Sequence, residues 1–333
     1  MTKIYIIILN YNGWKDTLEC LESVLKNDYS NYQIIVVDNN SPNGSMDFII
    51  DWAEGRQEPV FADNSQLKHF SQPFEIKPLP YVYYTNEEAG GRENKTIESS
   101  DKNPLIFIQA GENRGFAAGN NLGIKYALAR NDFDYIWLLN NDTVIEKDAL
   151  SRLVTFAHKH EVGICGSILK YYYEPEKIQA FGGGRVNKFF GTATHVTSLN
   201  EIDKIDYVVG AAFLINAEVI KKIGLLPEEY FLYYEETDYC FNAKQNGFNL
   251  AVAPDSKVYH KEGAATGANS SKPAERSEFS DVLSLKNRIR FHRKYLGGGP
   301  GLWSGIFISF LIRISRGQTK RIFKVLKTLL PKS

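Results

Sequence analysis

The feature that most constrains the fold is a regular alternation of apolar, β-branched runs with stretches of helical spacing. The apolar runs are KIYIIILN (3–10), YQIIVVDN (32–39), PLIFIQAG (104–111) and YIWLLNND (135–142). Segments with helical spacing, 14–26 and 115–130, stand between members of this series. Near-continuous apolar strands joined by helical crossovers are typical of a parallel sheet covered on both faces. The sequence therefore predicts an α/β fold, a Rossmann-like, mostly parallel sheet flanked by helices.

Polar residues stand at the ends of these predicted strands. They are Asn10, Asp38, Asn140 and Asp142. In open α/β sheets, ligands bind beyond the carboxyl ends of the strands. We therefore expect a binding site at these side chains.

The rest of the chain divides into an insertion, further sheet and helix segments, and a basic tail. Residues 51–103 are polar and rich in Pro, Gly, Glu and Asn, so we expect loops and an extra hairpin there, away from the chemistry. Further strands are expected at 162–169, 207–215 and 249–261, and helices at 147–160, 217–223 and 274–296. We predict one domain over residues 1–272, which contains the insertion, and a basic helical region over residues 273–333.

The net charge of zero conceals a strong asymmetry between the body and the tail. Asp281 is the last acidic residue, and residues 282–333 carry twelve Lys or Arg. The apolar stretch after Gly301 has roughly a dozen residues, whereas a membrane span needs about 20. A basic amphipathic helix lying on an anionic membrane face fits this pattern. A helix packed on the domain with its charges solvated is the alternative.

Other patterns exclude several classes of protein. Three cysteines without CxxC spacing indicate neither a disulfide framework nor a zinc site, and they fit a reducing cytosol. No small-residue cleavage site follows the apolar start, which is expected to be a strand rather than a signal peptide. The turn LNYNGWK lacks the GxGxxG fingerprint of dinucleotide-binding oxidoreductases. No nucleic-acid partner is expected.

Two glycine- or asparagine-rich turns could contact a nucleotide. Asp38, in VVDNNS, can accept from a base N–H or a ribose hydroxyl, although Asp, Asn and Ser at 38–41 suit a turn cap equally well. NRGFAAGNN (113–121) enters a predicted helix whose N-terminus, with Arg114, could hold a phosphate. Close packing of that helix on the sheet explains its glycines equally well.

Asn140 and Asp142 are candidates for a cation site. At i and i+2 of a strand end their side chains share one face, which suits a hard divalent cation that bridges a diphosphate. A turn in which Thr143 caps a following helix is the alternative. His260, at the end of the run KVYH, becomes a candidate ligand only if a metal lies near it.

The segment FLYYEETDYC (231–240) places Glu235, Glu236 and Asp238 directly after aromatic residues. Acids in the first turn of a helix interact favourably with its dipole, which is one explanation. Aromatic neighbours would also desolvate a carboxylate and raise its pKa, as a general base requires. Both interpretations remain open at this point.

The ordered set of these segments resembles glycosyltransferase family 2, whose members have the GT-A fold. The set is IIILNYNGW, VVDNNS, NRGFAAGNN, LLNND, VVGAAFLI, FLYYEETDYC and VYH. More narrowly, it is similar to rhamnosyltransferases and galactofuranosyltransferases that build bacterial surface polysaccharides. The resemblance covers about residues 3–45 and 105–262.

The resemblance implies roles for individual residues. Nucleotide binding is implied for Asn10, Asn12, Asp38, Asn113, Arg114, Asn120 and Asn140. Asn140-Asn141-Asp142 stands at the DxD position, and Asp142 with His260 is implied to bind Mg²⁺ or Mn²⁺. Glu235-Glu236 matches an acidic pair whose second member is the general base. This assignment favours Glu236 and keeps Glu235 open. Gly210, Ala211 and Asp238 are implied to lie near the donor or acceptor sugar.

The resemblance implies an inverting, metal-dependent glycosyltransferase. It would move a sugar from dTDP-rhamnose or a UDP-sugar onto a glycan acceptor, lipid-linked or free, in bacterial cell-surface polysaccharide synthesis. With the basic tail, the expected location is cytoplasmic and peripheral, on the inner face of the cell membrane. The rival hypothesis is a catalytically inactive sugar-nucleotide-binding or scaffold protein at the membrane.

Overall fold

The computed structural model describes residues 2–60, 66–91, 104–261 and 277–329. The strands are β1 (Ile4–Asn10), β2 (Tyr32–Asp38), β3 (Tyr81–Thr85), β4 (Leu105–Gln109), β5 (Tyr135–Asn140), β6 (Thr143–Ile145), β7 (Ile164–Tyr171), β8 (Ile178–Ala180), β9 (Gly183–Val186), β10 (Ala193–His195), β11 (Tyr207–Val208), β12 (Ala212–Asn216) and β13 (Leu250–His260). The helices are α1 (Trp14–Leu25), α2 (Ser45–Ala53), α3 (Lys68–Ser71), α4 (Asn86–Ala89), α6 (Phe116–Arg130), α7 (Ala149–Lys159), α8 (Ala217–Ile223), α9 (Glu235–Gln245), α10 (Glu278–Tyr295), α11 (Pro300–Ser315) and α12 (Thr319–Leu329).

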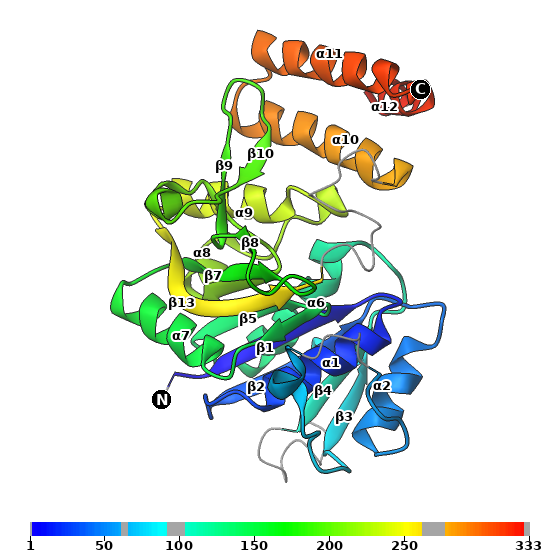
Figure 1. Ribbon diagram of the computed structural model, residues 1–333, viewed down its shortest axis with the longest axis vertical. Coiled ribbons are helices and arrows are strands. Elements are labelled where there is room, and N and C mark those ends of the chain that lie inside the picture. The colour runs from blue at the N-terminus through cyan, green and yellow to red at the C-terminus, as the bar shows by residue number, and fades with distance from the viewer. Residues whose placement is uncertain (1, 61–65, 92–103, 262–276, 330–333) are drawn as a thin grey trace.

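A mixed, mostly parallel sheet forms the centre of the molecule (Figure 1). Its main path runs β3-β4-β2-β1-β5-β12-β7-β13-β6, with β8 beside β7. The pairs from β3 to β5 are all parallel, whereas β12 runs antiparallel to both of its neighbours. The α/β fold expected from the alternation of segments is confirmed.

The position of β1 between two layers of helices explains why its sequence is continuously apolar. Ile4, Ile6 and Ile8 pack in the layer that contains α1, and Tyr5 and Ile7 pack in the layer that contains α6. Both faces of the strand are therefore buried, and each buried side chain of this size contributes about 1.5–3 kcal/mol. Helices cover the two faces because successive side chains of a strand point to opposite sides.

The glycines of α6 allow this helix to lie directly on β1. A Cβ built on Gly119 would stand 2.4 Å from Leu9 Cδ1, and one on Gly123 would stand 2.8 Å from Ile7 Cγ2. Both distances are too short for a real side chain. Close helix–sheet packing therefore accounts for these glycines, as the structural alternative predicted.

The insertion expected at 51–103 is only partly described, since residues 61–65 and 92–103 lie outside the described ranges. Tyr81–Thr85 form β3, which pairs in parallel with β4 at the edge of the central sheet. The prediction of a hairpin is wrong for this strand, because its partner is a strand that follows it by a long connection.

A second, three-stranded sheet of order β10-β9-β11 was not predicted. The strand expected at 207–215 is split: β11 joins this small sheet, β12 joins the central sheet, and Gly210 lies between them. The turn between β9 and β10 reaches α10, where Arg288 Nε donates to Phe190 O (2.9 Å). The β9–β10 hairpin thus connects the sheet region to the C-terminal helices (Figure 1).

The acid-free tail, residues 282–333, forms most of α10 and two further helices. Figure 1 shows α10, α11 and α12 together at one end of the molecule, beyond α9. They share a buried cluster of Leu285, Ile289, Leu302, Ile306 and Val325. Part of the positive charge is compensated internally, because Asp281 pairs with Arg313 (2.6 Å) and Arg321 (3.3 Å). Among the described helices none has the length and apolar character of a membrane span.

Candidate active site

Asn10 and Asp38 meet at the carboxyl ends of β1 and β2. Asn10 Nδ2 donates to Asp38 Oδ1 (2.6 Å), and Ser41 donates to Asp38 through its backbone N–H (2.9 Å) and its hydroxyl (2.6 Å). Asp38 is fully buried. Its carboxylate therefore holds the loop after β2, as the turn-cap alternative predicted.

Two other candidates for nucleotide binding, Asn12 and Asn113, lie around this loop, whereas Asn120 does not. The backbone N–H of Asn12 donates to Ser41 Oγ (2.8 Å). Asn113 Oδ1 accepts from Asn39 Nδ2 (2.9 Å), which joins the 113–115 turn to the end of β2. Asn120 lies inside α6 and donates to Phe116 O (3.0 Å), so it has a structural partner in its own helix.

Arg114 lies on the surface of the same turn. Its side chain is more than half exposed, and the guanidinium contacts Glu228 (2.9 Å) and Glu112 (3.5 Å). Glu228 also accepts from Asn121 Nδ2 (2.9 Å) in α6. The arginine is therefore held by acidic neighbours at the rim of the site, within reach of solvent.

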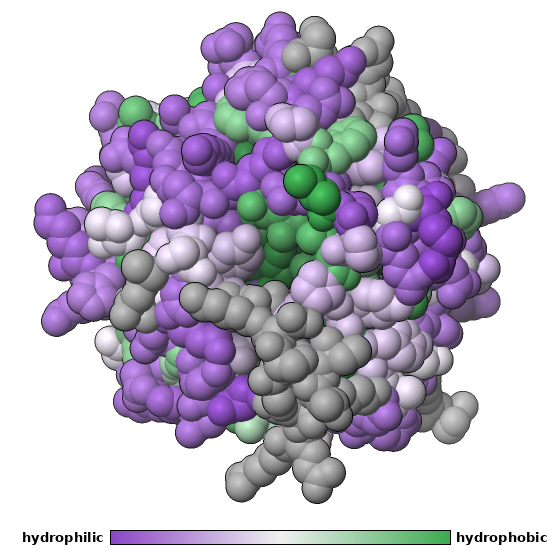
Figure 2. Space-filling view, turned by 90° about the horizontal axis from the view of Figure 1, so that it is seen from below, coloured by the Kyte–Doolittle hydropathy of each residue, from purple (hydrophilic) through white to green (hydrophobic). Residues whose placement is uncertain are grey.

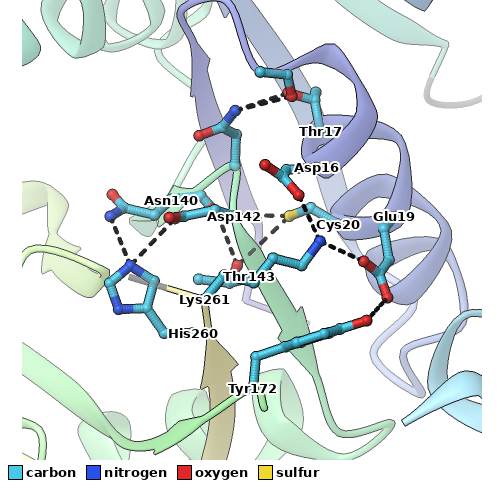
Figure 3. A network of polar contacts seen from close by, with 12 residues as sticks. Asp16, Thr17, Glu19, Cys20, Asn140, Asp142, Thr143, Tyr172, His260 and Lys261 are labelled. Carbon is cyan, nitrogen blue, oxygen red and sulfur yellow. Dashed lines mark hydrogen bonds and ion pairs between the residues drawn. The ribbon is translucent and has the colours of Figure 1, made fainter. Parts of the chain in front are cut away.

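Asn140, Asp142 and His260 come together (Figure 3). The Nε2 atom of His260 lies 3.2 Å from Asp142 Oδ1 and 3.4 Å from Asn140 Nδ2. Strand β5 ends at Asn140, so Asp142 stands in the turn before β6 rather than on the strand itself. The alternative in which Thr143 caps a helix is wrong, because Thr143–Ile145 form β6.

The orientation of His260 fits a metal ligand. Its Nδ1 lies 2.9 Å from Gln179 Oε1. Since an amide oxygen only accepts, Nδ1 carries the proton and Nε2 faces the carboxylate of Asp142. Burial opposes ionisation of Asp142, but a protonated His260, through its charge and its hydrogen bond, and Lys261 hold the pKa of the Asp142 carboxyl below the ordinary value. A bound cation would take the place of the Nε2 proton. An anionic oxygen beside an imidazole nitrogen is a donor set that Mn²⁺ or Mg²⁺ accepts.

The described residues contain no group of three or more His, Cys, Asp and Glu side chains that could hold a metal ion. Asp142 and His260 therefore provide two ligands at most from these residue types in the described part of the chain. Such a pair fits a cation whose remaining positions are filled by a substrate diphosphate and water.

Lys261 is a site neighbour that sequence reasoning missed. Its ammonium group donates to Asp16 (2.5 Å) and Glu19 (2.6 Å) of α1, and Tyr172 donates to Glu19 (2.6 Å) (Figure 3). Burial alone would lower the pKa of Lys261, but Glu19 and Asp16 raise it. Its backbone N–H also donates to Asp142 O (3.0 Å). Lys261 thus fixes the end of β13, and with it His260, against α1.

Glu235 and Glu236 form the first turn of α9. Glu235 is only 4% exposed, whereas Glu236 is partly exposed. Burial raises the pKa of Glu236 to about 7. Burial, with repulsion from Glu236, raises the pKa of Glu235 well above its ordinary value. The Oε2 atom of each carboxyl has no hydrogen-bond partner among the described residues.

Gly210 and Ala211 connect this acidic pair to the candidate metal ligands. A Cβ built on Gly210 would stand 3.8 Å from both Cβ and Cγ of Glu236. The neighbouring Ala211 O accepts from the backbone N–H of Asn140 (3.0 Å). The turn between β11 and β12 therefore has Glu236 on one side and the end of β5 on the other. This arrangement joins a partly exposed base candidate and a cation site in one region.

Asp238 is turned away from that region. Its carboxylate accepts from Tyr230 OH (2.6 Å), Tyr295 OH (2.7 Å) and Lys294 Nζ (2.7 Å), and it is 1% exposed. The structure thus gives Asp238 a different position from the one expected near a sugar, because all of these partners hold α9 to α10 and to the preceding loop.

Comparison with known proteins identifies the relatives of the chain. Residues 101–288, more than half of the chain, match the family described as "Glycosyltransferase like family 2", and residues 5–70 match "Glycosyl transferase family 2".

Two curated relatives are similar in sequence. The chain is 27% identical over 160 residues to the low-salt glycan biosynthesis hexosyltransferase Agl10 of Haloferax volcanii, which is 47% of this chain and 52% of that protein. It is 24% identical over 179 residues to the dTDP-rhamnosyl transferase RfbF of Shigella flexneri, 52% of this chain and 58% of that protein. The chain thus spans about half the length of the curated relatives it matches.

Solved structures with the same fold are GT-A glycosyltransferases. The mannosyltransferase PcManGT of Pyrobaculum calidifontis, in complex with GDP-Man and Mn²⁺, has a TM-score of 0.54 at 13% identity, covering 99% of this chain and 76% of its own. Residues 1–349 of S. aureus TarS have a TM-score of 0.51 at 15% identity, covering 87% and 65%. At such low identity these structures establish the fold alone, and the GT-A expectation is confirmed.

Proposed function

Because the chain belongs to glycosyltransferase family 2, we propose that it is an inverting, metal-dependent hexosyltransferase. It moves a sugar from a nucleotide diphosphate donor onto a glycan hydroxyl. The observation that carries this proposal is the position of Glu236, a carboxyl with a pKa of about 7 that lies against Gly210. The carbonyl oxygen of the adjacent Ala211 accepts a hydrogen bond from the backbone N–H of Asn140, at the strand end that leads to Asp142.

Each residue of the site has a separate role in a single displacement reaction. Glu236 accepts the proton of the attacking hydroxyl on the face of the sugar opposite the departing diphosphate. One base suffices, because inversion requires no covalent intermediate. When bound, a divalent cation held by Asp142 and His260 would neutralise the negative charge that develops on the diphosphate. Asn140 stands beside His260 (3.4 Å), where its amide can contact the same diphosphate.

The proposed donor is dTDP-rhamnose or a UDP-sugar, and the proposed acceptor is a glycan, lipid-linked or free, in bacterial surface polysaccharide synthesis. Two facts support this donor class. A curated relative is named as a dTDP-rhamnosyl transferase, and structures of the same fold are described with UDP-GlcNAc or GDP-Man. The loop held by Asp38, with Asn12 and the 113–115 turn, is the proposed nucleotide-binding edge.

Incubation with candidate donors tests whether the protein is an enzyme. With dTDP-rhamnose or UDP-hexoses and Mn²⁺ or Mg²⁺, we expect slow release of nucleoside diphosphate without acceptor, and no release after chelation by EDTA. Binding of a donor in thermal shift without any turnover, with either metal and with acceptor glycans, would instead support the inactive-scaffold alternative. A cognate donor is expected to stabilise the fold by mass action.

We also propose that the C-terminal helices bind an anionic membrane surface. Trp303, Phe307 and Leu311 are spaced by four residues along α11 and are 45%, 61% and 48% exposed. Exposed positive charges follow at Arg316, Lys320 and Lys327. The opposite end of the molecule, seen in Figure 2, is mostly hydrophilic apart from a hollow near its centre. An apolar stripe beside basic residues is the pattern of an interfacial helix. The proposed location of the protein is therefore the cytoplasmic face of the cell membrane.

A double substitution in the stripe tests this proposal. Phe307→Ser with Leu311→Ser is expected to lower binding to phosphatidylglycerol vesicles at least about tenfold, because two large apolar side chains no longer enter the interface. Flotation measures the bound fraction. Ile76→Ser, at an apolar residue that is 90% exposed elsewhere, is the control and should float like the unchanged protein. Equal flotation of all three proteins would contradict the membrane proposal.

A further inference from the structure

We propose that Asn287 of α10 is a positioning residue for Glu236. It holds the loop of residues 230–234 in the shape that presents Glu236 to the β11–β12 turn. The inference rests on the proposed role of Glu236 as general base, and it assigns part of the catalytic geometry to the C-terminal region.

The loop before α9 has an unfavourable backbone. Phe231, Tyr233 and Tyr234 have φ angles of 61°, 70° and 75°. Bulky residues rarely adopt the left-handed conformation, because the Cβ atom approaches the backbone, so it persists only where the surroundings hold it. Tyr234 directly precedes Glu235, the first residue of α9. The direction in which α9 begins therefore depends on what holds this loop.

Asn287 contacts the backbone of the loop at three positions. Its Nδ2 atom lies 2.7 Å from Tyr230 O, 2.8 Å from Leu232 O and 3.1 Å from Tyr233 O. The side chain is fully buried, and its Oδ1 atom has no hydrogen-bond partner among the described residues. The amide is thus used as a donor alone. It gathers three carbonyl groups of the loop, of which Tyr230 O also accepts from the backbone N–H of Leu232 (2.8 Å).

Helix α10 also holds the first turn of α9 directly. Lys294 and Tyr295 donate to Asp238 (2.7 Å each), and Asp238 lies two residues beyond Glu236. On the opposite side of the loop, Phe231 O accepts from the backbone N–H of Phe116 (2.6 Å). The loop is therefore fixed between α6 and α10, and Asn287 is the side chain that reaches its centre.

The alternative is that Asn287 only stabilises the fold. The two roles differ in what they change. A purely structural residue lowers stability without a selective effect on the chemical step. A positioning residue affects the rate of a correctly folded protein, because a displacement of the base by about 1 Å can lower the rate a hundredfold. Donor binding at the β1–β2 edge should be little affected, since Asn287 has no contact there.

The test compares Asn287→Asp with Leu285→Ala in the full chain. Asp has the same shape but no N–H donor, and it faces three carbonyl oxygens. Leu285 lies on the same helix, in the cluster between α10, α11 and α12, and its apolar side chain cannot donate a hydrogen bond to the loop. For Asn287→Asp we expect kcat to fall about a hundredfold, with the donor Kd within about threefold. For Leu285→Ala we expect a lower Tm with kcat within about threefold.

Asn287→Ser provides a second variant if Asn287→Asp does not fold. It retains one hydroxyl donor, so its kcat should fall about tenfold with the donor Kd unchanged. Asn287 variants that fold and keep kcat within about threefold of the unchanged protein would overturn the proposal. The proposal would also be overturned if an Asn287 variant lost no more kcat than a Leu285→Ala protein with the same Tm. Failure of the proposed function is a separate result, namely full activity of Glu236→Gln.

Discussion

Glu236→Gln is expected to lower the rate of sugar transfer by about a thousandfold. Glutamine keeps the size of the side chain but cannot accept the proton of the attacking hydroxyl. Donor affinity should stay within about twofold, because Glu236 lies beside Gly210 rather than in the Asn10–Asp38 region. Initial rates and isothermal titration with a donor measure the two quantities.

The matched variant is Glu235→Gln. Both carboxyls have raised pKa values: burial raises that of Glu236 to about 7, and burial with repulsion from Glu236 raises that of Glu235 well above its ordinary value. Glu235 is almost fully buried, whereas Glu236 is partly exposed and lies against Gly210, where an acceptor hydroxyl can approach it. We therefore expect Glu235→Gln to retain at least about a tenth of the activity. The opposite ranking would move the base to Glu235.

Glu236→Gln also has a consequence for stability. The pKa of Glu236 is higher in the folded protein than the 4.5 of a free side chain, so the folded state binds this proton more tightly. The stabilisation from this proton is complete below about pH 4.5 and is lost as pH rises through 7. At pH 8 the ionised carboxylate opposes folding. Glu236→Gln should therefore raise Tm at pH 8 while it removes activity, a combination expected of a catalytic group.

Asp142→Asn is expected to lower transfer about a hundredfold and to raise the metal concentration that gives half-maximal activity. Asparagine keeps the shape and can still contact His260, which lies 3.2 Å from the Asp142 carboxylate. It removes the negative charge that would attract a divalent cation beside the donor diphosphate. Activity measured across a Mn²⁺ titration separates loss of metal affinity from loss of rate.

Asp148→Asn is the control for this substitution. Asp148 lies next to α7 and pairs with Arg152 on the surface (2.6 Å), so its replacement should leave both the rate and the metal titration unchanged. If Asp142→Asn had the activity and metal dependence of the unchanged protein, the assignment of Asp142 as a metal ligand would be contradicted.

Residues of the site that stand at strand ends could be predicted from the sequence. Asn10, Asp38 and Asn140 follow continuous apolar runs, and the carboxyl ends of parallel strands share one edge of the sheet. Local pattern was also sufficient to predict the strand that ends in His260. The hydrophobic period and the polar residue that interrupts it are both local properties.

Partners distant in the sequence could not be predicted. Lys261 pairs with Asp16, 245 residues away, and Asn287 donates a hydrogen bond to Tyr230 O, 57 residues away. Nothing near either residue shows which carboxylates or carbonyls the fold will bring to it. The two interpretations of Asp38 were open for the same reason. Only the folded structure shows that Asn10 and Ser41 donate hydrogen bonds to this carboxylate, which therefore holds the loop.

The pH dependence of transfer tests the assignment of Glu236 most directly. With metal and donor saturating, the rates of the unchanged protein and of Glu235→Gln should fall about tenfold per pH unit below a pKa near 7, because the base must be ionised. The residual rate of Glu236→Gln should lack this dependence. A rate of the unchanged protein that stays constant from pH 8 to pH 5, or an unaltered profile in Glu236→Gln, would contradict the assignment.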